Sequence, residues 1–168
     1  MTALWYLLIV FTVFIGDMGL KNVIEKASFR KSAADVREKS VQTEEKYRLP
    51  CEILGGRILI RRHHNKGAVL NWGQNRRPVV AALSIVMSLL MTVVFLLSLG
   101  QRGNRLLRLG LSLLLGGAFS NTYDRLKRGY VVDYFSVHVK WKWLENIVFN
   151  VSDFCILIGA CLLVLGTA

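Results

Sequence analysis

The sequence predicts an all-α membrane protein of four transmembrane helices, with a small β-sheet at the membrane surface. The 168-residue chain is 53% hydrophobic although it carries 22 Lys/Arg and 11 Asp/Glu, so its charges must be segregated from its apolar residues. Residues 78–100 contain no charged side chain, and about 20 apolar residues suffice to cross the hydrocarbon core of a bilayer. The length suits a single membrane domain over residues 1–168.

Three further segments are apolar enough to span a membrane, at about residues 3–20, 104–126 and 145–168. The first lacks the basic start and the small-residue cleavage site of a secretory signal peptide, and Asp17 lies near its end, so we expect a retained anchor helix. The polar residues of the other two segments also lie near one end.

Two polar segments, at about 21–77 and 127–143, connect these spans. The composition of residues 29–48 is typical of an exposed helix or a mobile insertion. Residues 57–61 and 130–135 are rich in the branched and aromatic side chains that strands favour. We expect these two stretches to pair into the small sheet.

Four spans bring the polar ends of the helices to one side of the membrane. The ends of the first and third spans and the starts of the second and fourth lie on that side. Asp17, Asp124, Asp133, Asp153 and the 65–71 region therefore gather toward one face. Ionisable residues in spanning helices are costly, and they are candidates for a functional site.

An asparagine precedes each of two acids by three positions, as Asn121 precedes Asp124 and Asn150 precedes Asp153. Residues i and i+3 share a helix face, so each Asn can bind a carboxylate or a substrate backbone. Two carboxylates in one pocket can share a proton, so that one activates a water while the other donates to a scissile carbonyl. The same pattern is compatible with structural contacts between helices, or with an ion or proton relay.

The cysteines and histidines predict no metal site. No pair of the three cysteines has the spacing of metal ligands. His63 and His64 lie in a basic stretch without nearby acids or thiols.

Five short blocks follow one another along the chain: residues 17–21 (DMGLK), 65–70 (NKGAVL), 116–125 (GGAFSNTYDR), 129–134 (GYVVDY) and 149–153 (FNVSD). Their content and order resemble lipoprotein signal peptidase, also called signal peptidase II. The third and fourth blocks together are the most specific. The resemblance covers most of the chain except roughly residues 22–60.

This resemblance implies an aspartic endopeptidase that removes the signal peptide of a diacylglyceryl-modified prolipoprotein by cleaving just before the lipidated Cys. It implies Asp124 and Asp153 as the catalytic dyad. The residues that would shape the site or hold substrate are Asn121, Arg125, Asp133, Asn150, Asp17, Lys21, Asn65 and Gly67. It also implies that no metal or other cofactor is needed, and that the partners are the lipid-modified substrate and membrane lipids rather than nucleic acid.

Two cues for the orientation in the membrane conflict. Basic residues in short loops favour the cytoplasm, yet most of the 22 Lys/Arg lie in segments 21–77 and 127–143, which the family places outside. The loop at about 101–108 carries three arginines and no acid, in agreement with the family. We therefore follow the resemblance and expect a multi-pass protein of the bacterial cytoplasmic membrane, with its active site toward the outer face.

The chain departs from the family pattern at Ser120, where Gly is usual, at Ser152, where Ala is usual, and at Leu70, where an aromatic residue is frequent. A proline that commonly precedes Phe149 is also missing. Both acids are retained, so we expect activity. Two alternatives stay open: a non-catalytic relative that binds lipoproteins or another membrane partner, and a small ion or proton translocator.

Overall fold

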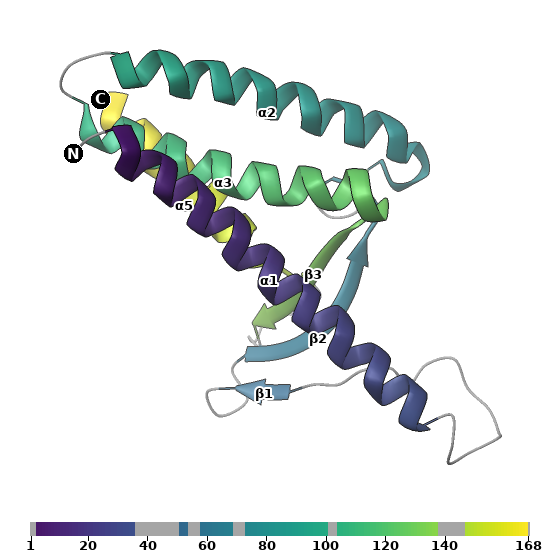
Figure 1. The fold of residues 1–168 in the computed structure, drawn as a ribbon. Helices are drawn as coiled ribbons and strands as arrows, with labels where there is room; N and C mark the ends of the chain where they lie inside the picture. Colours follow the sequence, from purple (N-terminus) through teal and green to yellow (C-terminus); the bar gives the residue numbers. More distant parts are fainter. Residues whose placement is uncertain are drawn as a thin grey trace. The chain divides into compact units, whose positions relative to one another are not determined.

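The computed structural model of the chain describes residues 3–35, 51–53, 58–68, 73–100, 104–137 and 147–167 (Figure 1). The helices are α1 (Ala3–Asp35), α2 (Arg77–Gly100), α3 (Arg105–Arg128) and α5 (Val151–Thr167), with a 3-10 helix, η2 (Gln74–Arg76), before α2. The strands are β1 (Cys51–Ile53), β2 (Ile58–Asn65) and β3 (Val131–Val137). The described residues divide into two compact units, one within Met1–Met18, Asn65–Val131 and Val151–Ala168, and the other within Gly19–His64 and Val132–Asn150.

Within the described residues, two helices are long and apolar enough to cross a membrane. They are Ala3–Lys26 of α1 and Arg77–Gly100, with mean hydropathies of 1.9 and 2.7. Only 17% of the most apolar 18-residue stretch of α2 is buried, and large side chains such as Leu89 and Leu97 are exposed. The core helix of a soluble protein would be mostly buried, so these outward apolar faces are those expected of a membrane protein. Helix α5 is apolar but shorter.

Helix α3 is the central helix of the first unit, and it packs along both α2 and α5 (Figure 1). Its glycines allow this close approach. A Cβ added at Gly110 would lie 2.7 Å from the backbone oxygen of Gly159 in α5, and one at Gly116 would lie 2.9 Å from that of Val10 in α1. Small residues at such positions let helix backbones pack tightly in a membrane.

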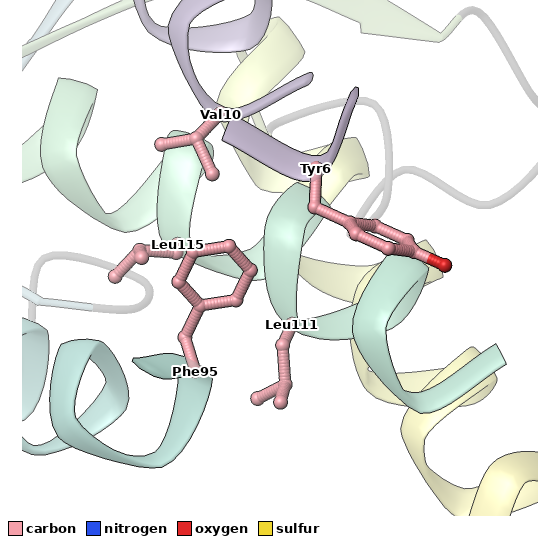
Figure 2. Packing of buried hydrophobic residues seen from close by; sticks show 5 residues of the cluster. All are labelled: Tyr6, Val10, Phe95, Leu111 and Leu115. Atoms are coloured by element: carbon pink, nitrogen blue, oxygen red, sulfur yellow. The ribbon is translucent and has the colours of Figure 1, made fainter. Parts of the chain in front are cut away.

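Five buried side chains come together where α1, α2 and α3 meet, namely Tyr6, Val10, Phe95, Leu111 and Leu115 (Figure 2). The Arg108 guanidinium lies 5.9 Å from the centre of the Tyr6 ring. This cluster is the apolar core of the first unit.

Both ends of α3 are capped. The Asn104 side chain accepts the Leu107 backbone N–H at 3.0 Å, and its amide donates to the Gly166 carbonyl of α5. At the other end, Gly129 has a φ of 76°, and its N–H donates to the Arg125 carbonyl at 3.1 Å. Glycine adopts this left-handed conformation at little cost, which explains a glycine where α3 stops before β3.

The second unit contains a three-stranded sheet in the order β1-β2-β3. Strands β1 and β2 are antiparallel, with Cys51 opposite Ile60. The neighbouring positions of β2 and β3 confirm that the two stretches predicted to be strands pair with each other. A further isolated bridge joins Phe135 of β3 to Phe149.

Charged residues of β2 are paired with α1 inside the same unit. Glu25 lies 3.2 Å from Arg62 and 2.7 Å from His64. Burial, together with the charges of Arg61 and His64, holds the pKa of His63 below its usual range. His63 is therefore neutral at pH 7, and the arginines supply the positive charge of this strand.

Two of the expected helix boundaries differ from the structure, while α2 and α3 agree closely with residues 78–100 and 104–126. Helix α1 continues to Asp35 instead of ending near residue 20, because the polar residues that follow include strong helix formers. The last helix begins at Val151 instead of 145, because the residue two positions earlier pairs with β3. Residues 29–35 of the expected exposed segment are helical, and its remainder lies outside the described residues.

The close contact of α3 with α5 leads to a stability prediction. Gly159→Ala should destabilise the fold by about 1–3 kcal/mol, because the added carbon would lie 2.6 Å from the Gly110 backbone oxygen. The matched control is Gly16→Ala, where nothing lies within 4 Å of the added carbon; this change should be neutral or stabilising by up to about 1 kcal/mol. Thermal unfolding of the purified variants in detergent measures the difference, and equal Tm values would contradict the packing.

Candidate active site

Asn121 links α3 to α5 at the two acids that the sequence singles out. Its side-chain amide donates to Asp153 Oδ1 at 3.1 Å. Asn121 and Asp124 are three residues apart on α3 and share a helix face, and Asp153 lies in the first turn of α5. The hydrogen bond therefore brings Asp153 to the face of α3 that carries Asp124.

The surroundings of the two acids differ. Asp124 is fully buried, and its Oδ1 lies 3.0 Å from a guanidinium nitrogen of Arg128, four residues further along α3. Asp153 is only partly buried. A buried carboxylate is costly unless an opposite charge compensates it, and Arg128 supplies that charge.

A third acid, Asp17 of α1, is fully buried and binds both α3 and α5. Its Oδ2 accepts the Ser120 hydroxyl of α3 at 2.6 Å and the Ser152 hydroxyl of α5 at 2.5 Å. Each serine immediately precedes a residue of the Asn121–Asp153 hydrogen bond. Asp17 thus joins the three helices next to the Asn121–Asp153 hydrogen bond.

A short turn before α2 is tied to the same region of α3. The Gly67 N–H donates to Asn65 Oδ1 at 3.0 Å, and the Asn65 amide donates to the Ala68 carbonyl at 3.2 Å. Arg125 donates to the Gly67 carbonyl at 3.1 Å and to the Asn121 carbonyl at 3.3 Å. Three of the predicted residues, Asn65, Gly67 and Arg125, therefore form one connected cluster.

The other predicted residues, Lys21, Asp133 and Asn150, lie in the second unit, and all three are buried. The Asn150 amide donates to Asp133 Oδ1 at 2.7 Å. The expectation that Asn150 and Asp153 share a helix face is wrong, because α5 begins only at Val151. The residue before Asn150 pairs with β3, which places the Asn150 amide beside Asp133 instead.

Sequence reasoning does not identify Arg128, Ser120 or Ser152 as site residues. Arg128 follows Asp124 by four positions, so the i,i+4 rule for helical ion pairs could have found it. The two serines adjoin predicted residues, but the hydrogen-bond partner of a short serine side chain depends on how closely two helices approach. No local pattern in the sequence shows that distance.

An apolar cavity of about 460 Å³ lies between α1, α2 and α3. Its walls include Phe11, Phe95, Phe119 and Leu126. Thr122, the neighbour of Asn121, also lines it. The cavity thus extends to the turn of α3 that precedes Asp124.

The donors and carboxylates of this site suit acid–base chemistry on water and carbonyl groups. Among the residues that the structure describes, no three His, Cys, Asp or Glu side chains are grouped so that they could hold a metal ion.

Comparison with known sequences finds many related proteins. A family model described as Signal peptidase (SPase) II matches residues 9–168. Lipoprotein signal peptidase of Alteromonas mediterranea is 34% identical over 107 residues, which are 61% of this chain and 56% of that protein. The protein of the same name from Ectopseudomonas mendocina is 45% identical over 90 residues (54% and 52%), and that from Coxiella burnetii is 40% identical over 107 residues (61% and 63%). The chain therefore spans 52–63% of the length of these curated relatives.

Two solved structures described as bacterial membrane enzymes have the same fold. One matches with a TM-score of 0.71 at 20% identity and covers 98% of this chain and 88% of its own. The other matches with a TM-score of 0.67 at 19% identity, with coverages of 98% and 93%. A helical fold with a small sheet, as the sequence predicts, is thus the fold of known membrane enzymes.

Proposed function

Because the chain belongs to the signal peptidase II family, we propose that it is a membrane aspartic endopeptidase that removes signal peptides from diacylglyceryl-modified prolipoproteins, cleaving before the lipidated Cys. The observation that carries the proposal is the Asn121–Asp153 hydrogen bond. It joins the face of α3 that bears Asp124 to the first turn of α5. The name of the curated relatives, lipoprotein signal peptidase, supports the choice of substrate.

In the proposed mechanism Asp124 and Asp153 form the catalytic dyad and share one proton. The ionised carboxylate takes a proton from a water, whose oxygen attacks the scissile carbonyl carbon, while the protonated carboxyl donates to the carbonyl oxygen. The tetrahedral intermediate then collapses as a proton passes to the amine of the lipidated Cys. The products are the free signal peptide and the lipoprotein with a new N-terminal Cys.

The remaining predicted residues support this chemistry. Asn121 fixes the Asp153 carboxylate through the hydrogen bond at 3.1 Å. The turn of Asn65 and Gly67, held by Arg125, offers backbone groups that can bind an extended peptide near the dyad. We propose supporting roles for Asp17, Lys21, Asp133 and Asn150, all of them buried polar residues.

The apolar cavity suits the hydrocarbon part of such a substrate. With a volume of about 460 Å³ and walls of Phe and Leu side chains, it can hold part of an acyl chain or apolar side chains of the signal peptide. Because acyl chains in the membrane are already out of water, the gain would come from van der Waals packing against these walls, which would favour a lipidated substrate over one without its lipid.

We propose that α1, α2, α3 and α5 are four spans of one membrane domain in the bacterial cytoplasmic membrane, with the dyad toward the outer face. The outward apolar side chains of α2 support this arrangement. The polar side chains of α3 would lie inside the bundle, where ionisable residues in membranes are found.

Cleavage of a lipidated prolipoprotein by the purified protein in detergent tests the proposed function. We expect a product that begins at the lipidated Cys, identified by mass spectrometry, and much slower cleavage of the same prolipoprotein without its lipid. Folded protein that binds several lipidated substrates without cleaving any of them would instead establish a non-catalytic relative.

A further inference from the structure

Two serines of the first unit have no role in the dyad chemistry described above. Ser120 and Ser152 are fully buried and come from different helices, yet both donate to the same oxygen, Asp17 Oδ2, at 2.6 and 2.5 Å. Hydrogen bonds to a carboxylate are shorter and stronger than those between neutral groups. Asp17 is therefore a common anchor for α3 and α5.

The position of the serines in the chain makes this anchor relevant to the dyad. Ser120 immediately precedes Asn121, and Ser152 immediately precedes Asp153. Asn121 and Asp153 form the 3.1 Å hydrogen bond between α3 and α5. At the same level a Cβ at Gly117 would lie only 2.6 Å from the Ser152 carbonyl oxygen. The helices are thus in close contact here. A shift of either helix along the other would alter both the Asn121–Asp153 hydrogen bond and the hydrogen bonds of the serines to Asp17.

We propose that Ser120 and Ser152 are positioning residues, which hold Asp17 as a shared anchor and thereby keep Asn121 within hydrogen-bond distance of Asp153. This inference rests on the proposed function, because it gives the serines a role in the peptidase reaction. They act through Asn121 and Asp153 and do not touch the substrate themselves. They are also two of the positions at which the chain departs from the usual family residues, Gly and Ala.

Ser112 provides a matched control on the same helix. It is also fully buried, but its hydroxyl donates to the Arg108 carbonyl of its own helix at 2.7 Å. Ser112→Ala therefore removes a buried hydroxyl of α3 without loosening a bond between helices.

The first test is the steady-state cleavage of a lipidated prolipoprotein by Ser120→Ala, Ser152→Ala and the double variant. We expect kcat to fall about ten-fold for each single change and further for the double change, with KM altered less than about two-fold. The changes Ser120→Cys and Ser152→Cys replace only the hydroxyl oxygen by a somewhat larger sulfur, which is a weak donor, so they should resemble the Ala variants. Wild-type kcat in the double variant, or an equal loss in Ser112→Ala, would overturn the proposal.

The second test does not depend on cleavage. In protein labelled with ¹⁵N-asparagine, the side-chain amide signal of Asn121, assigned with Asn121→Ala, reports on the bond to Asp153. We expect it to shift in the double serine variant but not in Ser112→Ala, and an unchanged signal would overturn the proposal even if the wild type cleaves no lipoprotein. If the wild type cleaves the lipoprotein and the serine variants cleave it equally fast, the positioning role alone is refuted.

Discussion

Asp124→Asn is expected to lower the rate of lipoprotein cleavage at least about a thousand-fold, and Asp153→Asn by a similar factor. Asparagine has the shape of aspartate but neither takes up nor releases a proton near neutral pH. Each change therefore removes one half of the proposed acid–base pair. The measurement is the initial rate of cleavage of a lipidated prolipoprotein by equal amounts of each purified variant in detergent. Thermal unfolding of the same samples checks that they are folded.

The double variant should be about as slow as the slower single variant, because residues that act as one unit do not lose their effects additively. Glu25→Gln is the matched control, since it removes a carboxylate that binds Arg62 and His64 in the second unit. Its rate should stay within about two-fold of the wild type. Full activity in either folded Asn variant would show that the dyad does not carry the chemistry.

The helices were predictable where one segment holds enough information by itself. Residues 78–100 are uncharged and apolar throughout, and α2 occupies Arg77–Gly100. The start of the last helix was not predictable in this way. Apolar residues continue upstream of Val151, but Phe149 pairs with Phe135 of β3, and this distant partner prevents the helix from beginning earlier.

The same limit applies to the site. The spacing of Asn121 and Asp124 indicates a shared helix face, and the structure adds that the Asn121 amide reaches across to Asp153. Asn150 has the same spacing from Asp153 but binds Asp133. Two identical local patterns thus have different partners, because the partner is determined by packing between elements and not by the pattern.

Asn121→Leu is expected to lower kcat about a hundred-fold, because a displacement of about 1 Å in a reacting group can reduce the rate by that factor. Leucine branches at Cγ as asparagine does, but its methyl groups cannot donate to Asp153 Oδ1, which now accepts the Asn121 amide at 3.1 Å. KM should change much less than kcat if the substrate is held mainly by its lipid and signal peptide. The measurement is steady-state cleavage of a lipidated prolipoprotein.

Asn104→Leu is the matched control, because Asn104 also donates an amide hydrogen bond from the α3 side to α5, at the opposite end of the helix pair. It should lower the free energy of unfolding by about 0.5–2 kcal/mol, since it also removes the N-cap of α3. Its kcat should remain within about two-fold of the wild type. Loss of kcat in both variants would mean that any loosening of α3 against α5 stops the reaction. Loss in Asn121→Leu alone would mean that Asn121 acts by fixing Asp153 in place.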